Sequence, residues 1–387
     1  MKILFICGCL EPGKDGVGDY VKVLGKELSF PDISVAILAI NDFYVSEEKE
    51  EVLEDVLVFR LSAQSKWRTR IDRSKIWINK FKPDHISWQF VLYAYHPKGL
   101  PVKPVYLVIN LLKNFHNVSI MFHELWIGAA REDSLTNKLT GKIQKLLISF
   151  MLQDLNPFQV FTSNTTYSRM LQKLGIKCKV LPLFSNILFV PGGREYFIEF
   201  LQDNNIDVPM NSLKIGHFGR IPFSWQRQKF YEELRKISSP VVFFIAGRSD
   251  QMMPKEFEDE LIKQMPYLQV VNIGEHPSHI ISGFLQYMDF GLSLNAPQIL
   301  GKSGVFAAFR EHGLPAVIAG MDKNYLENTS LYDYQDPLKI NLEDFAKKCK
   351  EVRKSQPKNT RKEISEQFFQ ALIGREKREE SAILFEF

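Results

Sequence analysis

The stretch from Phe290 to Gly320 constrains the fold of this chain more than any other. An apolar run at residues 290–294 is followed by a polar loop, and apolar residues then recur at helical spacing over residues 305–311. Gly313 stands where a glycine commonly ends a helix, and residues 316–319 form a second apolar run. The stretch therefore predicts a strand–loop–helix–strand unit, whose crossover places two parallel strands side by side.

The loop of this unit has the composition of a phosphate-binding loop. Its sequence Gly301-Lys302-Ser303-Gly304 follows the first strand, and the carboxyl ends of strands are where open α/β sheets bind ligands. Glycines let the backbone approach a ligand closely, the helix start offers N–H groups, and Lys302 adds a positive charge. The alternative is that Ser303 only caps the helix and that Lys302 is solvated.

The same alternation of strands and helices runs along the whole chain and restarts once. Because the chain has 387 residues, we expect two domains. Strands are predicted at residues 2–7, 34–40, 56–61, 85–89, 119–122, 158–162 and 179–183, and then at 214–218, 241–246, 269–273, 290–294 and 316–319. The pattern predicts an α/β protein with two Rossmann-like domains that face each other across a cleft.

The domain boundaries follow from polar, turn-rich segments. We expect an N-terminal domain at residues 1–184, a linker at 185–212 and a C-terminal domain at 213–353. The remaining residues, 354–387, read as a charged helical tail that packs back toward the N-terminal domain.

A second glycine-rich loop follows the first predicted strand. Gly16, Val17 and Gly18 lie between that strand and the first predicted helix, where a phosphate or a sugar commonly approaches backbone N–H groups. The loop lacks the G-x-G-x-x-G pattern of dinucleotide-binding proteins.

Composition narrows the class of protein. With 45% hydrophobic and 24% charged residues, the sequence is typical of a globular protein. It contains no apolar run near the ~20 residues that a membrane-spanning helix needs. The four cysteines, at positions 7, 9, 178 and 349, form neither a metal-binding spacing nor a disulfide framework, which favours a cytosolic compartment.

Charge is distributed unevenly. The net charge of +4 is too small to indicate nucleic-acid binding, but residues 1–185 carry 24 Lys/Arg and 18 Asp/Glu, which gives +6. The amphipathic helix predicted at residues 135–153 presents Lys138, Lys142 and Lys145 on one side. This face is either a solvated surface or one that contacts anionic lipid at the inner side of a membrane.

Five segments together resemble a known family. They are PGKDGVGDY, LPLFSN, HFGRIP, FIAGR and GKSGVFAAFREHGLPAVIAG, in chain order. They resemble glycosyltransferases of the GT-B fold, and most of all the large retaining family that includes lipopolysaccharide and phosphatidylinositol sugar transferases. The resemblance implies transfer of a sugar from a UDP- or GDP-linked donor to a hydroxyl group of a carbohydrate or lipid-linked acceptor. It implies no cofactor.

The resemblance also assigns roles to individual residues. It implies an N-terminal acceptor domain and a C-terminal donor domain, with the loop Gly16–Gly18 facing both the donor diphosphate and the acceptor. It places His123 near the transferred sugar, although a histidine satisfied at a strand end is an equal alternative. The donor phosphates and the nucleobase involve residues of the second domain, namely Arg220, Arg227 or Lys229, Gly274, Glu275 and the loop Gly301–Gly304.

One departure from the family is the loss of a Glu-x7-Glu pair, whose positions here are Leu300 and Ala308. This loss leaves a non-catalytic homologue, acting as a partner subunit, as an alternative. A third interpretation is a P-loop ATP-binding protein, because four residues separate Ala296 from Gly301-Lys302-Ser303, as four residues separate the first glycine of a P-loop from its Gly-Lys-Ser/Thr.

Simple electrostatics supports the transfer interpretation. Breaking a sugar–diphosphate bond builds negative charge on the leaving phosphate, which Arg220, Lys302 and the helix amides can stabilise. Since no Asp-x-Asp sequence occurs, we expect no bound metal and name His123, Arg220 and Lys302 as the candidate catalytic residues.

Overall fold

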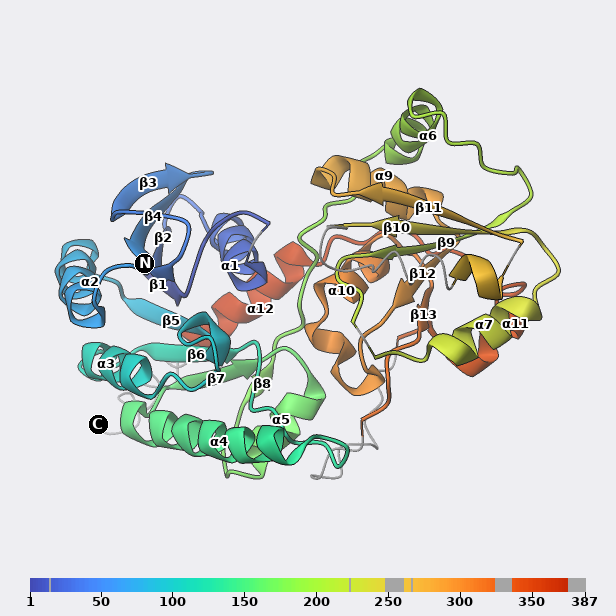
Figure 1. Ribbon diagram of the computed structural model, residues 1–387. Coiled ribbons are helices and arrows are strands. Elements are labelled where there is room, and N and C mark those ends of the chain that lie inside the picture. The colour runs from blue at the N-terminus through green and yellow to red at the C-terminus, as the bar shows by residue number, and fades with distance from the viewer. Residues whose placement is uncertain (14, 223, 248–260, 266, 324–335, 375–387) are drawn as a thin grey trace, which may run out of the picture. The chain divides into compact units, whose positions relative to one another are not determined.

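The computed structural model describes residues 1–13, 15–222, 224–247, 261–265, 267–323 and 336–374. The chain forms two compact units (Figure 1). Unit 1 comprises residues 1–182 and the C-terminal helix α12 (Arg361–Ile373), and unit 2 comprises residues 183–323 and 336–360.

Unit 1 is built on an eight-stranded sheet with the order β3-β4-β2-β1-β5-β6-β7-β8. Its strands are β1 (Lys2–Cys7), β2 (Ser34–Asp42), β3 (Lys49–Leu53), β4 (Val56–Ser62), β5 (His85–Phe90), β6 (Val118–Phe122), β7 (Gln159–Thr162) and β8 (Lys179–Val180). All neighbouring strands are parallel except β3 and β4. β1 has no exposed residue after Lys2, as expected of a parallel strand that is covered on both faces.

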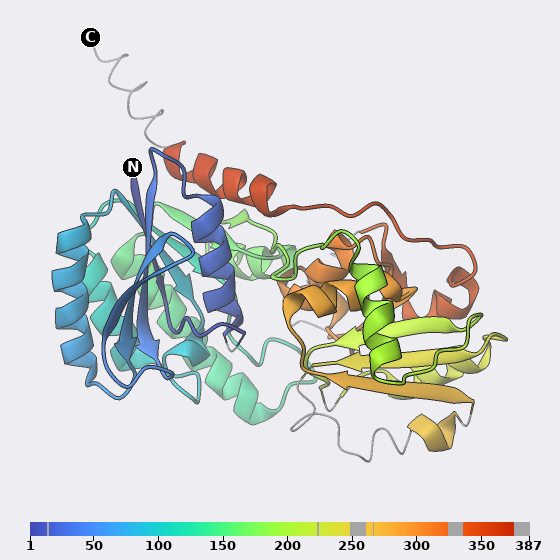
Figure 2. The same cartoon turned by 90° about the horizontal axis from the view of Figure 1, so that it is seen from above.

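The helices of unit 1 are α1 (Gly16–Glu27), α2 (Trp67–Phe81), α3 (Val102–Leu112), α4 (Leu135–Leu155) and α5 (Thr165–Gln172), with the short turn η1 at Leu92–Ala94. α2 contacts α3 and α3 contacts α4, so these helices form one layer (Figure 1). α12 packs beside α1 (Figure 2).

Helix α12 completes the hydrophobic core of unit 1. Its buried residues Ile364, Phe368 and Leu372 recur every fourth position, which places them on one face. The Phe368 ring lies 5.6 Å from that of Phe5 in β1 and 5.4 Å from that of Phe161 in β7. These three apolar residues of the predicted tail therefore belong to the core of unit 1.

Unit 2 is built on a six-stranded parallel sheet with the order β11-β10-β9-β12-β13-β14. Its strands are β9 (Leu213–Phe218), β10 (Val241–Ala246), β11 (Leu268–Gly274), β12 (Phe290–Ser293), β13 (Ala316–Ile318) and β14 (Lys339–Asn341). Its helices and helical turns are α6 (Gly193–Asp203), α7 (Arg227–Arg235), α9 (Ser278–Tyr287), η2 (Pro297–Lys302), α10 (Gly304–Glu311), η3 (Leu342–Asp344) and α11 (Phe345–Lys348).

Two apolar cores cover the two faces of this sheet. Phe243 and Phe244 are adjacent in β10 and point to opposite faces, as successive residues of a strand must. Phe243 joins a core with Phe230 of α7 and Phe345 of α11, whereas Phe244 joins the core beneath α6, α9 and α10.

The strands predicted from the sequence are all present, with ends that differ by up to three residues. The sequence did not predict β3 or β14, which are short strands at the edges of the two sheets. Residues 185–212, expected as a linker, contain α6 and belong to unit 2. The reason is that Phe197 and Leu201 of α6 are buried against α9 in the core of that unit.

Among the described residues, no helix combines the length and the apolar character that a membrane span requires.

We predict that Phe368→Ala destabilises unit 1 by about 3–5 kcal/mol, because the side chain is 1% exposed and fills the space between β1 and β7. Chemical denaturation followed by circular dichroism measures the change. Glu366→Ala on the exposed face of α12 is the matched control and should change stability by less than about 0.5 kcal/mol. Equal effects of the two substitutions would show that α12 does not contribute to the core.

Candidate functional site

The topology of unit 2 defines where a ligand is expected. The chain runs from β9 to β10 and β11 on one side, and then returns to β12 and β13 on the other side. β9 and β12 are neighbours, so the point where the strand order reverses lies between them. In open α/β sheets, ligands bind outside the carboxyl ends of the strands at this reversal point. The segments that emerge there begin at Gly219 after β9 and at Leu294 after β12.

A row of glycines marks this edge of the sheet. Gly219, Gly247 and Gly274 have φ values of +95°, +126° and +73°, which favour glycine over residues with a side chain. Gly219 N–H donates to the Ala246 carbonyl (3.0 Å), and Gly247 N–H donates to the Gly274 carbonyl (2.7 Å). The ends of β9, β10 and β11 are thereby joined, and the backbone along the edge carries no side chains at these turns.

The loop Gly301–Gly304 reaches the same edge. A Cβ atom added at Gly219 would lie 3.2 Å from Val305 in the first turn of α10, so Gly219 and the start of α10 are in contact. Arg220 follows Gly219 and is exposed, and Lys302 is the last residue of η2. The structure therefore brings Arg220 and Lys302 to the two sides of the reversal point.

Ser303 fixes the start of α10. Its hydroxyl oxygen accepts from Phe306 N–H (3.1 Å) and from the Asn295 amide (2.9 Å). The sequence offered this capping role as one alternative, and the structure shows that Ser303 performs it. At Gly304 an added Cβ atom would meet nothing within 4 Å, so the backbone there is open to a ligand.

This loop differs from a P-loop. A P-loop wraps its N–H groups around a phosphate in turns of alternating hand and uses the Ser or Thr hydroxyl to bind a metal ion. Neither Gly301 nor Gly304 has a positive φ. Because the Ser303 hydroxyl is already a helix cap, the geometry does not favour the ATP-binding alternative.

The positions of the family's glutamate pair are part of the core. Leu300 of η2 is 1% exposed and Ala308 of α10 is fully buried, and both belong to the same apolar core. A carboxylate at either position would be buried among apolar side chains, which is unfavourable without a partner. Any sugar contact in unit 2 must therefore come from other residues.

The remaining candidates of unit 2 lie further along the same edge. Arg227 is the first residue of α7, and its guanidinium lies 5.8 Å from the centre of the Trp225 ring. Gly274 ends β11, and the exposed Glu275 follows it. β11 is separated from β9 by β10 and hence by about 10 Å. The structure thus spreads the predicted residues over the segments at the ends of three strands, β9, β11 and β12, and does not gather them in one cluster.

In unit 1 the strand order reverses between β1 and β5, and the candidates Gly16–Gly18 and His123 both lie near this reversal. His123 follows β6 and is 7% exposed. Its Nε2 is 2.9 Å from the Gln89 side-chain oxygen, and its ring meets that of Tyr20 of α1 edge to face at 5.1 Å. Since Gln89 uses its amide nitrogen to donate to Ser87, its oxygen is left to accept from His123.

Burial controls the charge of His123. Removal from water lowers the pKa of the imidazole to about 3, so His123 is neutral at pH 7. Sequence reasoning did not find Gln89 and Tyr20, the partners that orient this histidine, because they come from β5 and α1 rather than from its own loop.

The loop before α1 is acidic rather than cationic. The Asp15 side chain caps α1 by accepting from Gly18 N–H (2.7 Å), and the Asp19 carboxylate accepts from Gly13 N–H at 3.1 Å. Burial raises the pKa of both carboxyl groups. A helix start that already holds a carboxylate is less suited to a phosphate. In this respect the loop before α1 differs from the loop Gly301–Gly304 of unit 2.

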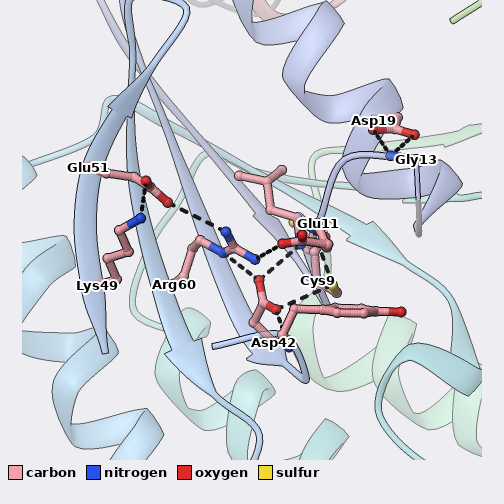
Figure 3. A network of polar contacts seen from close by, with 11 residues as sticks. Cys9, Glu11, Gly13, Asp19, Asp42, Lys49, Glu51 and Arg60 are labelled. Carbon is pink, nitrogen blue, oxygen red and sulfur yellow. Dashed lines mark hydrogen bonds and ion pairs between the residues drawn. The ribbon is translucent and has the colours of Figure 1, made fainter. Parts of the chain in front are cut away.

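A buried ion network holds this loop in place (Figure 3). Arg60 of β4 donates through Nε to Asp42 (2.8 Å) and through its terminal nitrogen to Glu11 (2.7 Å). Burial by itself raises the pKa of Asp42, but the hydrogen bonds from Arg60 and from backbone N–H groups lower it below its usual range. Gly18 packs against this segment, because a Cβ atom there would lie 2.5 Å from the Cys9 carbonyl oxygen.

Comparison with solved structures identifies the fold. The chain is similar to sucrose-phosphate synthase from Thermosynechococcus elongatus, at 13% identity, with 82% of each chain covered and a TM-score of 0.59. Anabaena Alr3699/HepE in complex with UDP and glucose matches at 14% identity over 99% of each chain, with a TM-score of 0.58. The lipopolysaccharide outer core galactosyltransferase WaaB matches at 12% identity over 97% of this chain and 100% of its own, with a TM-score of 0.56.

The class defined by these matches is the GT-B fold with two Rossmann-like domains, which confirms the fold class and the resemblance predicted from the sequence. The same fold occurs in UDP-GlcNAc 2-epimerase from Methanocaldococcus jannaschii, at 12% identity over 96% of this chain and 99% of that chain, with a TM-score of 0.51. No family model and no curated protein matches the sequence.

We predict that lowering the pH from 7.5 to 5 destabilises the wild type by about 2 kcal/mol more than His123→Gln. The unfolded histidine has a pKa of about 6.5 and the folded one of about 3, so acid protonates the unfolded state first. The stabilising effect is complete above pH 6.5 and is lost at about 1.4 kcal/mol per pH unit as the pH falls toward 3.

Urea denaturation at the two pH values measures this difference. His116→Gln, at an exposed position of unit 1, is the matched control and should lose as much stability between the two pH values as the wild type does. If His123→Gln also follows the wild type, His123 is not buried in its neutral form.

Proposed function

We propose that the protein is a glycosyltransferase that moves a sugar from a nucleoside-diphosphate donor to a hydroxyl acceptor, with retention of configuration and without a metal ion. The observation that carries the proposal is the edge of unit 2, where Arg220 and Lys302 lie on the two sides of the reversal point of the sheet, next to the open start of α10. Support comes from HepE, a protein of the same fold that binds UDP and glucose.

The proposed role of this edge is to stabilise the leaving diphosphate. Arg220 and Lys302 supply positive charge, and the Gly304 and Val305 N–H groups lie at the positive end of the α10 dipole. These groups are fixed before the reaction, because Ser303 and Asn295 hold the loop. Preorganised donors of this kind replace the charge that a divalent cation would supply. Gly301 completes the loop, and Arg227, Gly274 and Glu275 are the proposed contacts of the nucleotide.

The proposed role of unit 1 is to bind the acceptor and to position the reacting sugar. A neutral His123 can exchange a hydrogen bond with a sugar hydroxyl but carries no charge that would attract a phosphate. Gly16 and Val17 offer backbone contacts next to the carboxylate of Asp15, which suits an acceptor hydroxyl better than a diphosphate. The acceptor is a carbohydrate or a lipid-linked hydroxyl compound.

We predict that Lys302→Ala weakens binding of UDP by about 10- to 100-fold, because one charge-assisted hydrogen bond is worth about 1.5–3 kcal/mol. Isothermal titration calorimetry with UDP, GDP and ATP, with and without magnesium, measures the effect. Lys350→Ala, at an exposed position of unit 2, is the matched control and should bind like the wild type. Unchanged affinity in Lys302→Ala would leave the loop as a capped helix start only.

The products formed from a UDP-sugar distinguish a transferase from an epimerase and from a non-catalytic homologue. The wild type incubated with a UDP-sugar and candidate acceptors should release UDP, and nuclear magnetic resonance of the product should show the anomeric configuration of the donor. An epimerase would instead return a UDP-sugar with one inverted carbon. Tight UDP binding without either product would identify the non-catalytic alternative.

A further inference from the structure

Helix α4 carries an apolar stripe on its outer surface. Leu135, Leu139, Ile143, Leu146 and Phe150 are 83%, 63%, 40%, 70% and 43% exposed. Their spacing of four, four, three and four residues keeps them on one face of the helix. The opposite face, with Leu147, Ile148 and Met151 among its buried residues, packs against the rest of unit 1. The helix therefore has two apolar faces, and the sequence pattern alone reveals only that the helix is amphipathic.

The neighbouring helix also exposes apolar side chains. α3 packs beside α4 in the same layer, and its Val102 and Tyr106 are 54% and 53% exposed. Single exposed apolar residues are common, but large side chains that recur along a helix indicate an interaction surface.

Lysines border this stripe on one side. Lys138, Lys142 and Lys145 occupy the adjacent part of the helix circumference and line a pocket of about 470 Å³ together with Trp126. Lys138 donates to the Arg131 carbonyl (2.7 Å), and Lys145 lies 5.1 Å from the centre of the Trp126 ring. Residues 135–153 contain no Asp or Glu, and Asp154 lies in the last turn of α4, so most of the charge that the helix carries is positive.

The positive charge of this surface distinguishes between the partners that could bind it. A second copy of the chain would place the same three lysines close to one another, which is unfavourable. An acidic peptide would neutralise the lysines but gives no reason for five exposed apolar side chains along four turns. The boundary of an anionic bilayer meets both requirements, because apolar side chains enter the acyl region while lysines reach lipid phosphates.

We propose that the outer face of α4 docks in the plane of an anionic lipid bilayer. The stripe Leu135–Phe150 enters the boundary between head groups and acyl chains, and the lysine-lined pocket receives a lipid phosphate. The attachment is peripheral and reversible, since both apolar burial and electrostatic attraction contribute to it. This inference is independent of the proposed transferase activity and makes the same prediction for an inactive homologue.

The test is co-sedimentation of the full chain with vesicles of phosphatidylcholine, with and without phosphatidylglycerol. The wild type should partition onto the anionic vesicles, and high salt should release it. Replacing Lys138, Lys142 and Lys145 by Gln should lower the partition coefficient by about 100-fold, since each lysine near the surface contributes about a fivefold effect. Replacing Leu139, Leu146 and Phe150 by Ser should lower binding comparably.

The matched control replaces Lys347, Lys350 and Lys362, which are exposed elsewhere, by Gln. It removes the same net charge and should retain most of the binding. Thermal unfolding of all variants should match the wild type, because the altered side chains are exposed or partly exposed. Equal losses in the control and the α4 lysine variant would overturn the proposal, as would absence of wild-type binding. A dimer in light scattering that the serine variant dissociates would assign the face to a second copy instead.

Discussion

Right-handed crossovers between parallel strands decide where the candidate residues lie. In each unit the first strand is central, the next strands add on one side, and the later strands add on the other. A crevice then forms beside the first strand, because the connecting segments leave it in opposite directions. Gly16–Gly18 and Gly219–Arg220 occupy equivalent places after β1 and β9. Their positions follow from topology, not from the chemistry of the residues themselves.

The two edges differ in charge although their topology is the same. The helix start in unit 1 is capped by a carboxylate, Asp15, and Asp19 lies in the same turn. The helix start in unit 2 is capped by a neutral hydroxyl, Ser303, and is accompanied by Lys302 and Arg220. Unit 2 is therefore better suited to bind a diphosphate, and unit 1 is better suited to bind hydroxyl groups. This difference supports the assignment of donor and acceptor under the proposed function.

The sequence predicted the strands and the fold class because buried parallel strands are continuous apolar runs with clear ends. It did not predict β3, since Lys49–Leu53 is an exposed edge strand whose charged residues resemble a loop. It named His123 but not Gln89, because hydrogen-bond partners from separate strands leave no pattern along the chain. Asp15 stands directly before the first helix, where an aspartate is typical of a helix cap. The exposed stripe of α4 was likewise hidden, because helical spacing alone does not distinguish two apolar faces from one.

The order of the chain has a consequence for how the protein is made. Unit 2 is inserted into unit 1, because α12 returns to unit 1 only after residue 360. During vectorial synthesis the sheet of unit 1 emerges from the ribosome first, but the site that Phe368 fills beside Phe5 and Phe161 remains uncovered until unit 2 has been synthesised. The nascent chain therefore exposes an apolar surface throughout the synthesis of unit 2. Unit 1 therefore begins to fold before unit 2 but completes its core after unit 2.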